Sequence, residues 1–236
     1  MTGKPTANTE RTQHRPVLEV GARGWDHAAW VGSFYPDDLP PAWRLAYYAN
    51  EFSSVLVPAR QWQCADPGEV AGWAADVPER FVFFVELEAS VPERPRNPVQ
   101  EWRLRLDPLK EQLGGLLVRG AGADLQAPAL QALVAELTVE YPVWLEPDSP
   151  DGQPQWVEAS GAKWSWAGQQ QLQGRTVLGL VEVVGEKTGL RGLRDLLQGL
   201  LDAGPDADEA FLIFAGDPPD IDALRHAVTI ARLLGA

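Results

Sequence analysis

Residues 24–36 read GWDHAAWVGSFYP and directly follow a short apolar run at 18–22. Four aromatic residues fall within eleven positions of this stretch: Trp25, Trp30, Phe34 and Tyr35. Aromatic side chains bring a large apolar surface, and the indole N–H and phenol O–H need partners when they are buried. Aromatic residues this dense, just after a strand, typically line a pocket or pack a loop over one. We therefore expect Trp25 to be buried near a site and the other three to pack the first loop onto the fold.

Short apolar runs alternate with helical patterns along the rest of the chain. The eight runs, which we predict to be strands, lie at 17–23, 53–58, 81–88, 115–119, 143–147, 163–167, 176–184 and 210–215. Amphipathic helices are predicted at 41–51, 67–76, 97–113, 125–140, 190–203 and 220–234. This alternation is typical of parallel β/α units, and 236 residues is close to the roughly 250 of an eight-fold barrel. We predict a single TIM-type (β/α)8 barrel over residues 17–236.

Two connections are too short for a full outer helix. Residues 152–161 leave room for a turn or two between the fifth and sixth strands, and the spacer 169–175 leaves none between the sixth and seventh. We therefore predict a reduced or missing helix between strands six and seven. Residues 1–16 are polar without an apolar stretch, so we expect a disordered tail and no signal peptide.

The amino-acid composition of the chain narrows the kinds of partner that it is expected to bind. The net charge is −13, and an acidic surface repels phosphate backbones, so general nucleic-acid binding is disfavoured. No apolar run approaches the roughly 18 residues of a membrane span. The single Cys64 allows no internal disulfide or zinc motif and fits a reducing compartment. These features predict a cytoplasmic protein that binds neither membrane nor general nucleic acid.

The site of such a barrel lies at the carboxyl ends of its strands, where several acids, arginines and aromatic residues occur. Glu86 and Glu88 end the third strand on one face, because strand side chains alternate, and Asp217 follows the eighth strand. The candidate catalytic residues are Glu86, Glu146 and Glu182. The candidate ligand-binding residues are Arg23, Trp25, Asp26, His27, Trp62, Glu88, Arg119 and Trp166.

These acids allow more than one interpretation. Two carboxylates roughly 5 to 10 Å apart are the arrangement of glycosidases, but acids at strand ends also form ion pairs with arginines. His27 is placed for acid–base chemistry, or it is a solvated loop residue. Three histidines do not supply a multi-histidine metal centre, so no metal site is assigned. Clustered carboxylates leave a divalent metal open, and no other cofactor is predicted.

The opening stretch also carries a family resemblance. GWDHAAWVGSFYP at 24–36 and LAYYANEFSSV at 45–55 resemble the first two conserved blocks of the YecE-like family, also called domain of unknown function seventy-two. The resemblance implies an eight-fold β/α barrel, in agreement with the strand count. It implies no activity, because the activity of the family is not established.

At the strand ends the chain departs from the pattern of that family. Glu86 stands where the family has Lys, and Glu146 and Pro147 stand where it has Arg and His. Residues 181–185 lack the Arg-x-His-Gly of the seventh strand. The resemblance therefore implies a divergent member that keeps the apolar core and replaces most polar site motifs.

Two functions stay open. The first is a non-catalytic barrel that binds a small molecule or a protein partner. The second is a carboxylate-based hydrolase, glycosidase-like or assisted by a divalent metal, with Glu86, Glu146 and Glu182 at its centre. In either case the exchange of positive for negative residues at the strand ends favours a neutral or cationic ligand, or a divalent metal, over an anion.

Overall fold

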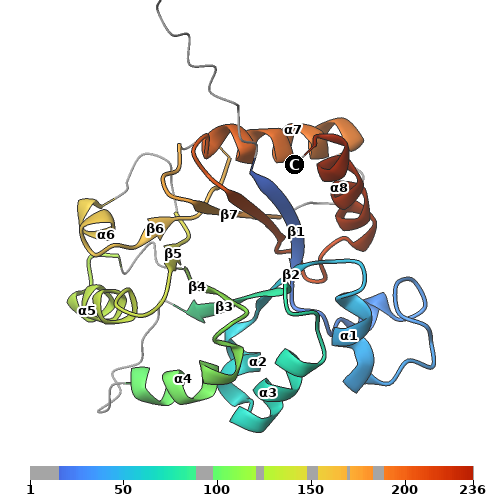
Figure 1. Cartoon of the computed structure of the whole chain (residues 1–236), viewed down its shortest axis with the longest axis horizontal. Coiled ribbons are helices and arrows are strands. Elements are labelled where there is room, and N and C mark those ends of the chain that lie inside the picture. The colour runs from blue at the N-terminus through green and yellow to red at the C-terminus, as the bar shows by residue number, and fades with distance from the viewer. Residues whose placement is uncertain are drawn as a thin grey trace, which may run out of the picture.

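Eight parallel strands ring the centre of the molecule, with helices outside them (Figure 1). The structure is a computed structural model of the chain, and it describes residues 16–88, 98–120, 125–147, 154–168, 171–182 and 189–235. Each predicted run overlaps a strand: β1 (Val17–Arg23), β2 (Ser54–Val57), β3 (Val82–Glu88), β4 (Leu113–Arg119), β5 (Val143–Leu145), β6 (Lys163–Trp164), β7 (Thr176–Val181) and β8 (Glu209–Phe214). The predicted TIM-type barrel is confirmed, whereas the predicted tail over 1–16 lies, except for Pro16, outside the described residues.

The sheet closes at one narrow seam. Its hydrogen-bonded order is β6-β5-β4-β3-β2-β1-β8-β7, and every pair is parallel. Strands β6 and β7 meet through a single bridge between Trp166 and Gly179. There the Trp166 N–H donates to the Leu178 carbonyl at 2.7 Å, and the Leu180 N–H donates to the Trp166 carbonyl at 3.2 Å. The barrel is therefore a ring with seven ladders and one weak join.

The helices are mostly shorter than the sequence predicted. They are α1 (Arg44–Tyr48), α2 (Ala59–Cys64), α3 (Pro67–Ala75), α4 (Val99–Leu106), α5 (Pro128–Leu137), α6 (Gln155–Ala159), α7 (Leu190–Ala203) and α8 (Ile221–Leu233), with 3-10 turns at Ala28–Trp30, Pro41–Trp43 and Asp107–Leu109. The predicted helix over 97–113 was wrong at its end, because Pro108 lacks the N–H that an α-helix interior needs. The Asp66 side chain caps α3 by accepting from two backbone N–H groups.

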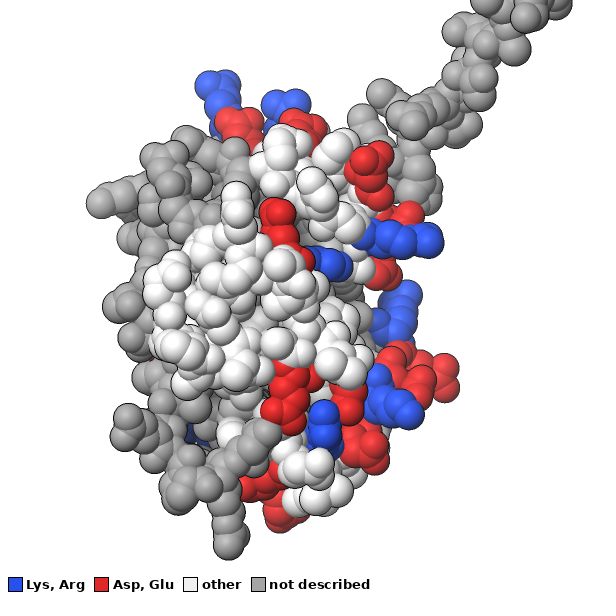
Figure 2. Space-filling model, turned by 90° about the vertical axis from the view of Figure 1, so that its left-hand side faces the viewer, with Lys and Arg blue, Asp and Glu red and all other residues white. Residues whose placement is uncertain are grey.

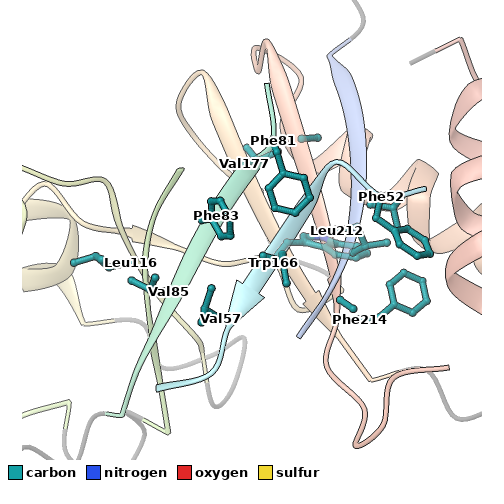
Figure 3. Packing of buried hydrophobic residues seen from close by; sticks show 14 of the residues in the cluster. Phe52, Val57, Phe81, Phe83, Val85, Leu116, Trp166, Val177, Leu212 and Phe214 are labelled. Atoms are coloured by element: carbon teal, nitrogen blue, oxygen red, sulfur yellow. The ribbon is translucent and has the colours of Figure 1, made fainter. Parts of the chain in front are cut away.

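The predicted gap in the outer layer is confirmed, since the described residues between β6 and β7 contain no helix. Helix α7 covers this sector instead. The Trp166 ring lies so close to Gly199 of α7 that a Cβ there would meet it at 3.0 Å. The Leu172 N–H donates to the Ala203 carbonyl at the end of α7. Figure 3 shows Trp166 among the buried residues of this outer core.

Side chains alternate between two apolar cores, as the period of a strand requires. The inner core fills the barrel and includes Phe84, Trp144 and Phe211, with the Phe84 ring centroid 5.7 Å from Trp144 and 5.0 Å from Phe211. The outer core lies between strands and helices and includes Val57, Phe83, Val85, Leu116 and Phe214 (Figure 3). Because the inner core is solid, the polar ends of the strands are where a site can form.

The aromatic residues of the first loop are buried, as predicted. The Trp30 indole donates to the Pro219 carbonyl at 3.0 Å, and the Tyr35 hydroxyl donates to the Trp25 carbonyl. Tyr48 of α1 adds a link between strands, because its hydroxyl accepts from the Ala22 N–H at 2.8 Å and donates to the Ser54 carbonyl at 2.9 Å. The loop is thus pinned to the barrel through its polar atoms as well as its rings.

Figure 2 shows the side of the molecule that carries α5 and α6. The centre of this face is free of Lys, Arg, Asp and Glu among the described residues, and charged side chains of both signs lie along its right-hand edge and toward its top and bottom. No basic patch is visible on the described part of this face. As for membranes, none of the helices in the described ranges has the length and apolar character to span one.

Candidate functional site

Inward-facing residues at the strand ends build a polar layer above the inner core. On β3, Phe84 belongs to the inner core, so Glu86 and Glu88 face the same side two and four residues later. The same alternation brings Arg23 inward on β1, Arg119 on β4 and Glu146 just after β5. We call Arg23, Glu86, Arg119 and Glu146 the mouth network, and the end of the barrel that they occupy the mouth.

The mouth network is a chain of alternating charges. Arg23 holds Glu86 with two hydrogen bonds, Nε to Oε2 at 2.5 Å and Nη2 to Oε1 at 2.9 Å. Arg119 lies between the two acids: its Nη1 is 3.5 Å from Glu86 Oε2, and its Nε donates to Glu146 Oε2 at 3.0 Å. The Glu86 side chain is 5% exposed, whereas those of Arg23 and Arg119 are 26% and 23% exposed. The predicted acids therefore meet arginines here instead of converging on open space.

Electrostatics follow from this pairing. The hydrogen bond with Glu86 is the main cause that raises the pKa of Arg23, and the charges of Glu86, Asp217 and Glu88 raise it further. Asp217, which follows β8, is thus part of the electrostatic surroundings of the mouth. The sequence placed Asp217 at a strand end. It could not show that the charge of Asp217 acts on Arg23, because that effect depends on distances across the barrel.

Trp62 supports the mouth network from behind. It lies on α2, a helix that the sequence analysis missed, and its side chain is fully buried. Its indole donates to the Glu86 carbonyl at 2.8 Å, and its ring packs edge-on against Trp102. The predicted ligand-binding Trp62 therefore lies where it holds the end of β3, with no exposed surface for a ligand.

His27 is tied to the end of β1. Its Nε2 lies 2.9 Å from the Arg23 carbonyl oxygen, and its ring is tilted against Trp30 at a centroid distance of 4.5 Å. Burial lowers the pKa of His27, against the opposing effects of that hydrogen bond and of Asp217 and Asp26. His27 is therefore a mostly neutral, half-buried residue that joins the first loop to the mouth.

Three further acids lie outside the mouth network. Glu88, Glu182 and Asp217 are exposed, and the described part of the chain offers none of them an ion-pair partner. We call these three the rim acids. Together with the mouth network they amount to five acids and two arginines, which is a surplus of three negative charges among these seven residues.

The family of the chain follows from comparison with known proteins. A family model described as "Protein of unknown function DUF72" matches residues 19–236. The chain belongs to this family. A DUF72 family protein from Enterococcus faecalis is similar to it at 16% identity, with a TM-score of 0.69 over 93% of this chain and 96% of that one. One from Thermotoga maritima is similar at 16% identity, with a TM-score of 0.66 over 93% and 100%. A comparison with curated protein sequences finds no match.

Two predicted ligand-binding tryptophans of this DUF72 chain lie on the helix side of the barrel wall. Trp25 packs edge-on against Trp73 of α3 at 5.3 Å, and Trp166 packs against α7. Both are buried in the outer core, so we leave them out of the proposed site. The sequence placed Trp166 at the end of the sixth strand, but it did not show on which side of the barrel wall the ring lies.

Asp26 lies outside the mouth network of this DUF72 chain. Asp26 is half exposed and pairs with Arg44, which ties the first loop to α1. Across the residues that the structure describes, no three His, Cys, Asp or Glu side chains are grouped as metal ligands. The mouth is therefore built as an ion-pair network beneath exposed acids.

Proposed function

We propose that this DUF72 chain is a binding barrel, which holds a small organic cation at its mouth without changing it chemically. The observation that carries the proposal is the state of Glu86. Both of its carboxylate oxygens accept hydrogen bonds from arginines, and its side chain is almost fully buried. A general acid, base or nucleophile must touch its substrate, and Glu86 has neither free oxygens nor open surface for that contact.

The charge of the mouth supports a cationic ligand. Arg23 and Arg119 are neutralised by Glu86 and Glu146, whereas the rim acids have no such partner in the described structure. A small ammonium compound beside one of the rim acids would gain Coulomb energy of about 1 to 4 kcal/mol per close contact near a surface. An anion there would meet an unfavourable potential of the same order.

A thermal-shift series followed by calorimetry tests this proposal. The probes are choline and cadaverine as organic cations, glucose as a neutral ligand, and Mg²⁺ and Ca²⁺ as metals. A ligand that binds the folded state raises the Tm, so we expect the organic cations to raise it. Glu182→Gln and Asp217→Asn should weaken their binding. Glu209→Gln is the matched control, since Glu209 is an exposed acid at the other end of the barrel.

Two results would overturn the proposal. The first is a rise in Tm with glucose or a metal and none with the organic cations. The second is turnover of aryl glycosides that disappears in Glu146→Gln or Glu182→Gln. The second result would establish the hydrolase alternative, because it needs a carboxylate that acts on substrate.

A further inference from the structure

A groove of about 260 Å³ opens at the amino-terminal end of the barrel, opposite the mouth. Its walls come from the start of β1, the connections before β2 and β3, and the last turns of α8. Strand β1 and helix α8 pack side by side there (Figure 1). Small-molecule pockets run from about 300 Å³ upward, so the groove is sized for a compact ligand.

The groove has an apolar floor. Leu18, Phe52 and Phe81 line it and are buried, and both phenylalanines are part of the outer core in Figure 3. These side chains come from three separate segments, and Tyr48 links the two rings at 4.8 Å from Phe52 and 6.3 Å from Phe81. A ligand that enters the groove meets the accessible apolar side chains of Val17, Pro78 and Val228, which also line it.

Two exposed arginines border this floor. Arg80 and Arg232 line the groove and are exposed, and no ion pair or hydrogen bond joins either one to another described residue. Glu51 in the same wall is already used, because Arg225 donates to its two oxygens at 2.8 and 2.9 Å. In a chain of net charge −13, two guanidinium groups that the described residues leave unpaired at one groove mark a local site for an anion.

Glu19 limits the charge of that anion. It lines the groove, and its carboxylate accepts from the Ser53 hydroxyl. Arg80 and Arg232 supply two positive charges and Glu19 one negative charge, so the groove has a surplus of one positive charge. A monoanion is better matched to it than a dianion, and a carboxylate has the planar shape that guanidinium groups bind through two hydrogen bonds.

We infer that this groove binds a small organic monocarboxylate with an apolar body. The carboxylate lies between Arg80 and Arg232, and the apolar body covers Val17, Pro78 and Val228. The site is separate from the mouth and takes a ligand of opposite charge, so it does not depend on the proposed function.

Calorimetry with three phenyl compounds tests the inference. Phenylacetate is the monocarboxylate, phenyl phosphate the dianion and 2-phenylethanol the neutral compound. We expect phenylacetate to bind one to one and at least about tenfold tighter than the other two, since hydrogen bonds between charged groups carry that difference. Its affinity should fall as NaCl screens the charges.

Substitutions locate the binding. Arg80→Gln and Arg232→Gln should each weaken phenylacetate binding about tenfold or more. Arg194→Gln should leave it unchanged, because Arg194 is an exposed arginine of α7 outside the groove. Glu182→Gln at the mouth should also leave it unchanged, which separates this test from that of the proposed function.

The inference is overturned if phenylacetate fails to bind at millimolar concentration, or if phenyl phosphate binds more tightly. It is equally overturned if Arg80→Gln and Arg232→Gln bind phenylacetate as Arg194→Gln does. All three arginines are exposed, so loss of folding does not obscure the comparison.

Discussion

Replacing Glu86 with Gln tests the mouth network directly. The substitution keeps the size of the side chain and one acceptor oxygen, but it removes the negative charge between Arg23 and Arg119. Arg119 retains Glu146 as a partner, whereas Arg23 loses its ion-pair partner. We therefore expect Glu86→Gln to lower the free energy of unfolding, chiefly through Arg23.

The magnitude follows from the contacts of Glu86. Two of its hydrogen bonds are short, at 2.5 and 2.9 Å, and the third, at 3.5 Å, is too long to count fully. Bonds to charged groups contribute about 1.5 to 3 kcal/mol each, and breaking a buried pair costs about 3 to 5 kcal/mol. Gln keeps part of one bond, and the guanidinium groups are about a quarter exposed. The expected loss is about 2 to 4 kcal/mol.

Urea unfolding followed by tryptophan fluorescence measures this loss. Glu182→Gln is the matched control: it makes the same chemical change at the same end of the barrel on an exposed residue, and it should stay within about 0.5 kcal/mol of the parent. A double-mutant cycle of Glu86→Gln with Arg23→Gln should give a coupling of at least about 1 kcal/mol. A loss at Glu86 no larger than that at Glu182, or a coupling near zero, would refute the reasoning.

Three further predictions concern the first loop and its anchors. Burial lowers the pKa of His27, so His27 binds a proton more readily in the unfolded chain than in the folded one. The free energy of unfolding should therefore fall as the pH drops below about 6.5. Urea unfolding of His27→Gln should show a smaller fall over the same pH range. Tyr48→Phe removes the hydrogen-bond partner of two buried backbone groups, so it should lower the free energy of unfolding in urea by about 2 to 5 kcal/mol. The control is Tyr47→Phe, whose hydroxyl has no hydrogen bond in the described structure and which should cost under about 0.5 kcal/mol. Equal losses in the two variants would contradict this. Trp25→Ala should cost about 3 to 5 kcal/mol by the same measurement, far more than Trp43→Ala at a side chain that is 66% exposed; a loss below about 1 kcal/mol would show that Trp25 is a surface residue.

The fold could be predicted because strands buried on both faces read as continuous apolar runs. The runs at 115–119 and 210–215 matched β4 and β8 within two residues. Helix α2 escaped prediction because its six residues follow Pro58 and are too few to show a helical period. Its buried Trp62 therefore looked like a mouth residue, although it lies behind β3.

The site could be predicted only as a set of strand ends. Sequence placed Arg23, Glu86, Arg119 and Glu146 at the same end of the barrel. It could not show that Arg119 lies between two acids, because that contact depends on the stagger of β3, β4 and β5. The groove at Arg80 and Arg232 was missed for a similar reason, since its walls come from segments more than 150 positions apart in the chain.

The join between β6 and β7 is the place where the barrel should open locally most often. Parting these strands at the Trp166 bridge breaks two backbone hydrogen bonds, whereas parting β3 from β4 breaks a ladder of six residue pairs. Openings that need the fewest bonds occur most often. Deuterium should therefore replace the amide hydrogens of Trp166 and Leu180 long before those of β3, and the interior of the ring should first meet solvent through this sector.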